Sequence, residues 1–261
     1  MDIFQAIILG IIQGITEWLP ISSEAMVTLA GRFLFDHGYQ EALGTAIWLH
    51  TGTTIAAIIY FREEIIDIVK SAYTKSNKDL LIFLMITTII SGIVGFSFLI
   101  FLFNFIIPDE IFTTVIGIFL IGISYLQKKA SAGKLTEIKP IKAVAVGIAQ
   151  GFSILPGISR SGITIVTLLM EKYNLKQSLK LSFLMSIPVT FGAGILLPVI
   201  KEGFVISIPL IIGSLVAALV GFVTIKNLMK FAEKTNFSKA TLILGLIITI
   251  IGIISIILQA V

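Results

Sequence analysis

Apolar residues run along this chain in eight blocks that short polar segments separate. The blocks cover about residues 3–34, 43–61, 80–102, 111–127, 142–170, 181–200, 208–228 and 240–260. Six of these blocks have about the 20 residues that a helix needs to cross the hydrocarbon core of a bilayer. Ile, Leu and Phe predominate and do not alternate with polar residues, which favours helices over the strands of a membrane barrel. The pattern therefore predicts one all-α polytopic membrane domain over residues 1–261.

The first and fifth blocks are too long for a single span, and each is interrupted in its middle. The first contains LPISS at residues 19–23, and the fifth contains LPGISRS at residues 155–161. Pro lacks a backbone donor and Gly relaxes the dihedral angles, so we expect each block to split there into two half-helices. Half-helices of this length predict a re-entrant hairpin that returns to its own side of the membrane.

Basic residues indicate the orientation of the chain. Sixteen of the 19 Lys and Arg residues lie in four connections, at 62–79, 128–142, 171–180 and 226–239. If the first and fifth blocks are hairpins and the other six are spans, all four connections lie on one side, which the positive-inside rule makes the cytoplasmic side. We therefore expect a multi-pass protein of the plasma membrane with both termini outside.

This layout is an inverted-topology repeat, because the two hairpins enter from opposite sides and three spans follow each of them. GIIQG at 10–14 recurs as GIAQG at 147–151, and LPISS is echoed by LPGISRS. The two repeats would cover about residues 1–130 and 138–261. In proteins built in this way, the working site lies on the broken helices near the bilayer midplane.

Composition excludes several classes of site and partner. Hydrophobic residues make up 56% of the chain and charged residues only 13%, which is typical of a membrane protein. The absence of Cys excludes disulfides and thiolate metal sites, and two His residues are too few for a His-based metal cluster. The net charge of +4 comes from lysines between apolar blocks, so topology explains it and we expect no nucleic-acid partner.

Ionisable residues at membrane depth are costly and therefore indicate function. Glu17, Glu24 and Arg160 lie in or beside the two breaks, and His50 lies in the second block. Gln13 precedes Glu17 by four residues, so these two side chains share one helix face. Structural roles stay open beside the functional ones: Arg160 could simply neutralise Glu17, and Gln13 and His50 could be packing residues.

Hydroxyl groups gather at both breaks, where the first N–H groups of the next half-helix attract anions. The hydroxyl residues are Ser22 and Ser23 in the first hairpin and Ser159, Ser161 and Thr164 in the second. Ser22 and Ser23 could also be plain N-caps of the half-helix, and we expect capping to account for at least one of them. Together with these hydroxyls, the Arg160 guanidinium supplies what binding of a phosphate or diphosphate group requires.

Four motifs occur in order along nearly the whole chain. They are QGITEWLPISS at 13–23, LHTGT at 49–53, PGISRSGIT at 156–164 and SFLMSIP at 182–188. Together they resemble the undecaprenyl-diphosphate phosphatase family of the bacitracin-resistance type. The resemblance implies an enzyme that hydrolyses a C55 polyprenyl diphosphate to the monophosphate at the outer membrane face, which recycles the lipid carrier for cell-envelope glycan synthesis. It also implies dependence on a divalent cation, Mg²⁺ or Ca²⁺.

The resemblance also implies roles for individual residues. Glu17 would be an essential carboxylate, Ser23 the nucleophile or a phosphate ligand, and Arg160 the diphosphate-binding arginine. In such an enzyme we expect Glu17, with or without Glu24, to act as a base or to hold the metal. Gln13 would be a substrate-binding residue at a position that admits Glu or Gln. The remaining residues that would bind substrate are Ser22, Ser159, Ser161 and Thr164.

Met26 departs from the pattern of that family. The family typically continues Ser-Ser-x-Gly-His, whereas this chain reads SSEAM at 22–26. A thioether cannot transfer a proton, so Glu24, Glu17 or His50 would take that role in a working phosphatase. A transporter or flippase of polyprenyl phosphates or small anions on the same fold is the alternative function. The oligomeric state stays open, with a homodimer as one arrangement.

Overall fold

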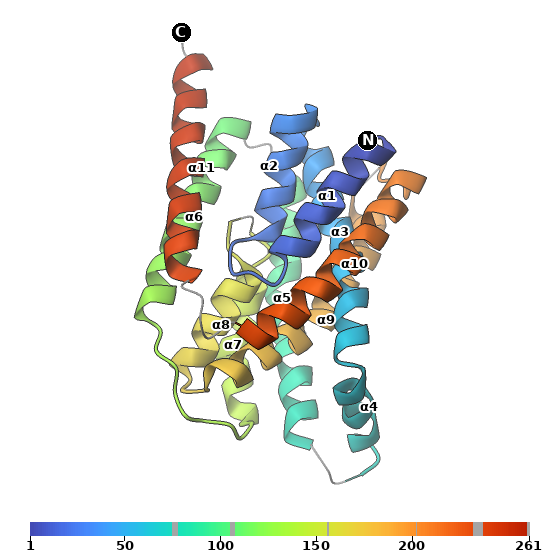
Figure 1. Cartoon of the computed structure of the whole chain (residues 1–261), viewed down its shortest axis with the longest axis vertical. Helices are drawn as coiled ribbons and strands as arrows, with labels where there is room; N and C mark the ends of the chain where they lie inside the picture. Colours follow the sequence, from blue (N-terminus) through green and yellow to red (C-terminus); the bar gives the residue numbers. More distant parts are fainter. Residues whose placement is uncertain (75–77, 105–107, 156, 202, 232–236, 260–261) are drawn as a thin grey trace.

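The computed structural model describes residues 1–261 except 75–77, 105–107, 156, 202, 232–236 and 260–261. The described residues form helices, with one isolated bridge between Leu135 and Tyr173 and no strand among them. Six helices are long and apolar enough to cross a membrane, which confirms the predicted all-α polytopic fold (Figure 1). They are α3 (Tyr39–Tyr60), α5 (Lys78–Asn104), α6 (Asp109–Lys129), α9 (Leu175–Ile200), α10 (Ile208–Phe231) and α11 (Phe237–Gln259).

Each of the two long blocks is split into a pair of short helices at the predicted break. The first pair is α1 (Ile3–Thr16) and α2 (Ser23–Phe35), and the second is α7 (Ala143–Phe152) and α8 (Arg160–Met170), preceded by the 3-10 turn η1 (Pro140–Lys142). In Figure 1, the first pair lies in the upper half of the molecule and the second in the lower half. The backbone enters the left-handed region at Ser22 (φ 65°) in one break and at Gly157 (φ 95°) in the other. Pro156, to which the second break was assigned, lies outside the described residues.

The connection at 62–79 contains a helix that the sequence analysis missed. This helix, α4, spans Arg62–Ser71, and its apolar side packs Ile65 and Ile68 against the core. Its many charged residues mark it as a connection, although apolar residues recur in it at helical spacing. α9 likewise begins at Leu175, ahead of the predicted 181, because the Asn174 side chain accepts a hydrogen bond from the backbone N–H of Gln177 at 2.8 Å.

Small residues let several helix pairs pack closely. α1 lies along α10, α7 lies along α5, α6 lies along α11, and α3 contacts both α9 and α10. A Cβ atom on Gly14 of α1 would lie 2.8 Å from the backbone N of Gly221 in α10, so only glycine permits this approach. Each half of the chain thus packs its broken helices against a span of the other half, and the inverted relation between the halves stays a prediction.

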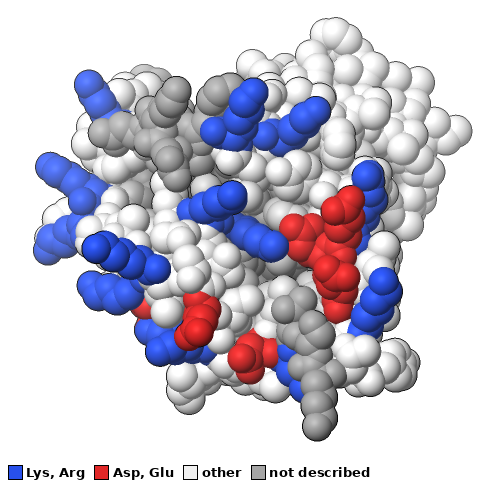
Figure 2. All heavy atoms as spheres, turned by 60° about the horizontal axis from the view of Figure 1, so that its bottom comes forward, with Lys and Arg blue, Asp and Glu red and all other residues white. Residues whose placement is uncertain are grey.

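The end of the molecule away from the termini carries many charged side chains. In Figure 1, α1 begins and α11 ends at the upper end. Figure 2 shows the lower face, over which many Lys and Arg side chains are spread together with acidic residues. Two ion pairs join segments of this charged region. Lys180 Nζ of α9 lies 3.1 Å from Glu64 Oε1 of α4, and Lys142 Nζ of η1 lies 2.5 Å from Glu171 Oε2, which follows α8. The basic connections therefore gather away from the end that carries the termini.

Candidate active site

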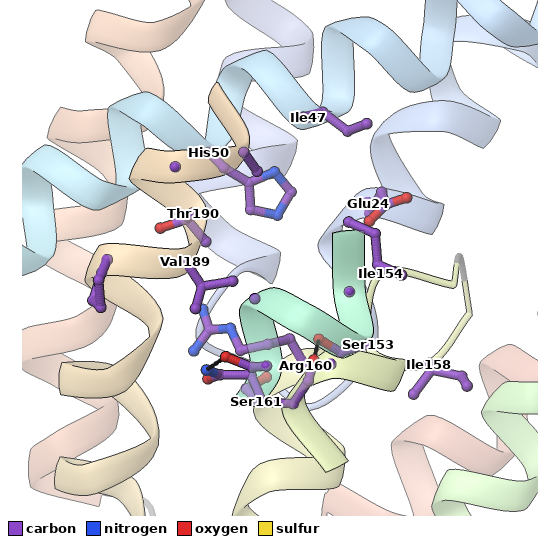
Figure 3. Close-up of a pocket in the computed structure, with 18 of the residues that line it drawn as sticks. Glu24, Ile47, His50, Ser153, Ile154, Ile158, Arg160, Ser161, Val189 and Thr190 are labelled. Atoms are coloured by element: carbon purple, nitrogen blue, oxygen red, sulfur yellow. Dashed lines mark hydrogen bonds between the residues drawn. The ribbon is translucent and has the colours of Figure 1, made fainter. Parts of the chain in front are cut away.

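A cavity opens where the two hairpin breaks meet, between α3, α5 and α9. Figure 3 shows His50 from α3 and Glu24 from α2 on one side of it, with Arg160 and Ser161 from α8 on the other. The predicted site residues that line the cavity are Glu17, Ser22, Ser23, Glu24, His50, Ser159, Arg160 and Ser161. The structure therefore brings together residues from both halves of the chain, as the two polar breaks predict.

The Glu17 carboxylate is the centre of the site. Its Oε2 accepts hydrogen bonds from Ser23 Oγ at 2.6 Å and from Gln13 Nε2 at 2.8 Å, and it lies 3.2 Å from His50 Nε2. Its Oε1 pairs with the Arg160 guanidinium. The side chain is 3% exposed, so the two charges stabilise each other in a nearly dry environment. One carboxylate, that of Glu17, thus forms the ion pair with Arg160 and accepts the hydrogen bond from the Ser23 hydroxyl.

The end of α1 places Glu17 in this position. Glu17 follows the last helical residue, and its N–H donates to the carbonyl of Gln13 at 3.0 Å, so the two side chains remain on one face. The next residue, Trp18, is buried and donates its indole N–H to the carbonyl of Gly221 at 2.9 Å. Both contacts direct the break toward the interior of the bundle.

The start of α8 positions Arg160. Ser159 caps this half-helix, since its Oγ accepts from the N–H of Gly162 at 3.1 Å. A second guanidinium nitrogen of Arg160 donates to the carbonyl of Ser182 in α9 at 3.2 Å. Thr164 lies behind the cavity and not in its lining, where its hydroxyl bonds to Ser182 Oγ at 2.7 Å. Gln13 likewise lies behind Glu17.

The two breaks contact each other directly. Ser22 Oγ accepts from the N–H of Gly157 at 3.3 Å, and Ser161 Oγ donates to the carbonyl of Leu19 at 2.9 Å. The expectation that Ser22 or Ser23 caps α2 is wrong. Ser22 occupies the N-cap position without a capping bond from its side chain, and the Ser23 hydroxyl is bonded to Glu17. The hydrogen bonds of Ser22 with Gly157 and of Ser23 with Glu17 thus take the place of local capping.

Glu24 and His50 face the cavity and are placed for proton or cation chemistry. Glu24 is 9% exposed, and its Oε1 has no hydrogen-bond partner among the described residues. His50 Nδ1 lies 2.8 Å from the carbonyl of Ala46, and its Nε2 faces the Glu17 carboxylate. Both ring nitrogens face acceptors, and an imidazole can donate to both only when it carries two protons.

Met26, at the position where the family resemblance expects histidine, does not line the cavity. It is partly buried and packs against an apolar cluster of α2, α6 and α11 residues. That cluster contains Ala25, Phe112, Ile116, Leu120 and Ile248. Glu24 and Met26 lie on different faces of α2, because two residues turn a helix by about 200°.

Five further polar residues line the cavity and were not assigned to the site from sequence: Thr88, Ser91, Gln150, Ser153 and Thr190. Gln150 Nε2 donates to Ser91 Oγ at 3.1 Å, and Thr190 Oγ1 lies 2.6 Å from Thr54 Oγ1. The recurrence of GIIQG as GIAQG contained the signal for Gln150, since it places this residue at the position of Gln13. Ser91 and Thr190 lie inside long apolar helices, where no local pattern distinguishes them from packing residues.

The side chains of the cavity could bind a divalent cation only if phosphate oxygens of a substrate supplied further ligands. In the part of the chain that the structure describes, no group of three or more His, Cys, Asp or Glu residues is arranged so that it could hold a metal ion. Both Glu17 oxygens already face donors, whereas Glu24 lines the cavity and its buried Oε1 has no hydrogen-bond partner among the described residues. Mg²⁺ is commonly bound by one or two carboxylates together with substrate phosphates, and Glu24 suits this arrangement. The assignment of Glu17 as a metal ligand stays a prediction.

Comparison with known proteins identifies the family. A protein named undecaprenyl-diphosphatase from Methanococcoides burtonii is 42% identical over 95% of this chain and 97% of its own length. Proteins with the same name from Methanothrix thermoacetophila and Halothermothrix orenii are 34% and 36% identical, over 95% and 97% of this chain and 96% and 99% of their own lengths. The sequence model of the family described as bacitracin resistance protein BacA matches residues 6–253. The chain therefore belongs to the BacA family of bacitracin resistance proteins.

Proposed function

We propose that this chain is a membrane-embedded phosphatase that hydrolyses undecaprenyl diphosphate, or a similar polyprenyl diphosphate, to the monophosphate. The observation that carries the proposal is the shared Glu17 carboxylate, which joins a buried serine and an arginine in a cavity between broken helices. Relatives that carry the name undecaprenyl-diphosphatase support the substrate class. The product would return as a lipid carrier for cell-envelope glycan synthesis.

The cavity suits an anionic headgroup attached to an apolar tail. α2 and α8 both begin at its edge, so the positive ends of two half-helices and the Arg160 guanidinium face the same volume. Much of the remaining wall is apolar, with Ile154, Val189 and Leu196 among its residues. We assign the diphosphate to the end near Arg160 and the first isoprene units to the apolar wall.

We assign the attack on the terminal phosphorus to Ser23. Its Oγ already donates to Glu17 Oε2, so this carboxylate accepts the proton as the new bond between oxygen and phosphorus forms. The anhydride P–O bond breaks and the polyprenyl monophosphate leaves with the bonding electrons. Water then hydrolyses the phosphoserine to inorganic phosphate and restores the serine. Arg160 and the half-helix N–H groups stabilise the charge on the phosphoryl oxygens.

We assign the remaining proton transfers to His50, which contacts the same Glu17 oxygen as Ser23. Glu24, with the diphosphate oxygens, would hold a divalent cation that neutralises phosphate charge when bound. His50 thus takes over the proton transfer that Met26 cannot perform.

The test of the proposed function is release of inorganic phosphate by the purified protein in detergent. The substrate is undecaprenyl diphosphate, assayed with Mg²⁺, with Ca²⁺ and with a chelator. We expect one phosphate and one polyprenyl monophosphate per turnover. A protein that binds the lipid phosphate but releases no phosphate under any of these conditions would instead support the carrier function.

Replacing either Glu24 or His50 by Ala is expected to lower turnover at least about tenfold, about 1.4 kcal/mol of barrier. Each change removes an ionisable group from the cavity wall while the helix backbone keeps its other contacts. The matched control is Met26→Leu on the same half-helix as Glu24, which should keep wild-type turnover because residue 26 packs outside the cavity. Full activity of both alanine variants would contradict the roles given to these residues.

We further propose that the end with the termini faces outward in the plasma membrane. The chain contains no Cys, so single cysteines introduced at chosen sites report sidedness without background. Cysteines in the connections at 62–79, 128–142, 171–180 and 229–239 should react with a membrane-impermeant maleimide only from the cytoplasm, and those at either terminus only from outside. Residues 232–236 of the last connection lie outside the described part. Labelling of 128–142 and 171–180 from opposite sides would contradict both the hairpins and the inverted repeat.

A further inference from the structure

The break between α1 and α2 determines how Ser23 meets Glu17, because these two residues flank it. The break is short and tightly turned: the N–H of Ile21 donates to the carbonyl of Leu19 at 2.8 Å, and Ser22 has a φ of 65°. A residue other than glycine pays a conformational cost in this left-handed region, so the surrounding structure must maintain it. The contacts that hold the break therefore control the 2.6 Å bond from Ser23 Oγ to the Glu17 carboxylate.

The carbonyl of Pro20, in the middle of this break, accepts two hydrogen bonds from distant side chains. Gln127 Nε2, at the end of α6, donates to it at 3.0 Å. The hydroxyl of Thr241, in the first turns of α11, shares its single proton between this carbonyl, 3.1 Å from Oγ1, and the carbonyl of Phe237 in its own helix, 2.9 Å from Oγ1. Thr241 is 0% exposed. Side chains of two helices thus bond to one backbone carbonyl. Gln127 lies 107 residues and Thr241 lies 221 residues further along the chain than Pro20.

The two donors belong to helices that pack closely together. Ser124 of α6 and Ser238 of α11 exchange hydrogen bonds, from each hydroxyl to the carbonyl of the other, at 2.9 and 3.0 Å. A Cβ on Gly117 would meet the backbone of Thr249 at 2.5 Å. None of the described α6 or α11 residues lines the cavity. The α6–α11 pair contacts the first hairpin through the Pro20 carbonyl and through apolar contacts with α2. It therefore supports this hairpin from outside the cavity.

A second, largely apolar cavity lies behind the break. Trp18, Pro20 and Gln127 line it together with Ile165, Leu179 and Leu228. If the two donors were removed, the Pro20 carbonyl would face apolar side chains and could regain a partner only from water. Loss of a partner by a buried carbonyl is unfavourable, and the adjacent space would let the break relax.

We propose that Gln127 and Thr241 are positioning residues, which hold the Pro20 carbonyl and thereby keep Ser23 Oγ aimed at the Glu17 carboxylate and the substrate. The inference rests on the proposed phosphatase function. Neither residue touches the substrate, so their loss should lower kcat and leave KM nearly unchanged.

Kinetics of isosteric variants test the proposal. Thr241→Val keeps the shape of the side chain and removes the donor, and Gln127→Leu does the same at the second position. We expect the double variant to lose about tenfold in kcat, since small misplacements of reacting groups are costly. Thr241→Ser retains a hydroxyl and should restore kcat. The control is Thr224→Val in α10, whose hydroxyl bonds, among the described residues, only to the carbonyl of Val220 in its own helix, at 2.9 Å.

Fluorescence of Trp18 tests the same proposal without catalysis. The chain has two tryptophans, so Trp48→Phe leaves Trp18 as the only reporter, and this residue lies in the break with 1% exposure. In that background, Thr241→Val with Gln127→Leu should shift the Trp18 emission to longer wavelength and increase its quenching by acrylamide, whereas Thr224→Val should not. Wild-type kcat and unchanged Trp18 emission in the double variant would overturn the proposal. A wild type without turnover would overturn the phosphatase function alone, and Trp18 emission would then decide the positioning role.

Discussion

Replacing Glu17 by Gln is expected to lower phosphate release about a thousandfold or more, because the variant loses both the acceptor for the Ser23 proton and the negative charge at the centre of the site. The carboxylate receives Ser23, Gln13 and His50 on one oxygen and pairs with Arg160 through the other. A glutamine has one acceptor oxygen, and its NH₂ group would face donors. Phosphate release with the purified variant measures the loss.

A second substitution separates catalysis from stability in this experiment. Glu17→Gln leaves the buried Arg160 without its counter-ion, which should cost about 3–5 kcal/mol of folding free energy. Glu17→Gln combined with Arg160→Gln removes both charges, so we expect part of the stability to return in a thermal or denaturant melt. Activity should not return. Recovery of turnover in the double variant would show that Glu17 serves mainly to neutralise Arg160.

Replacing Arg160 by Lys is expected to lower kcat/KM about a hundredfold, as loss of a preorganised donor to a transition-state oxyanion does. The guanidinium uses one nitrogen for Glu17 and another for the carbonyl of Ser182, and its planar fork can still present N–H groups to a phosphate. A lysine ammonium is a single point of charge and cannot make all three contacts. Because the ion pair with Glu17 remains available to lysine, the variant should fold and insert in the membrane.

The matched control for this prediction is Arg62→Lys. Arg62 begins α4 on the surface, and its guanidinium pairs with Glu63 at 4.0 Å with both side chains mostly exposed. Exposed ion pairs contribute little, so this variant should match the wild type in both turnover and melting temperature. If Arg160→Lys also retained wild-type kcat/KM, the guanidinium would have a structural role and the phosphate would bind elsewhere.

Local elements of the fold could be predicted from sequence because each depends on neighbouring residues. Uninterrupted apolar blocks long enough for the bilayer gave the six spans, and the two breaks rich in Pro, Gly and Ser gave the four short helices. The two errors of prediction, at α4 and at the start of α9, also have a local cause. α4 was missed because charged residues outweighed its apolar side, and the start of α9 was placed too late because its first turns are rich in Lys and Ser.

The sequence by itself determined the membrane class, the two polar breaks and the residue types that could bind a diphosphate, since hydrophobic length and buried charge are properties of short segments. Only the tertiary structure decided which partners these residues have. It paired Arg160 with Glu17, turned Met26 toward an apolar cluster, drew Ser22 and Ser23 away from capping, and brought Gln127 and Thr241 to Pro20. Apart from the bond of Ser23 to Glu17, six residues earlier, these outcomes depend on contacts between segments far apart in the chain. The packing of helices selects among many partners that are chemically equivalent in the sequence.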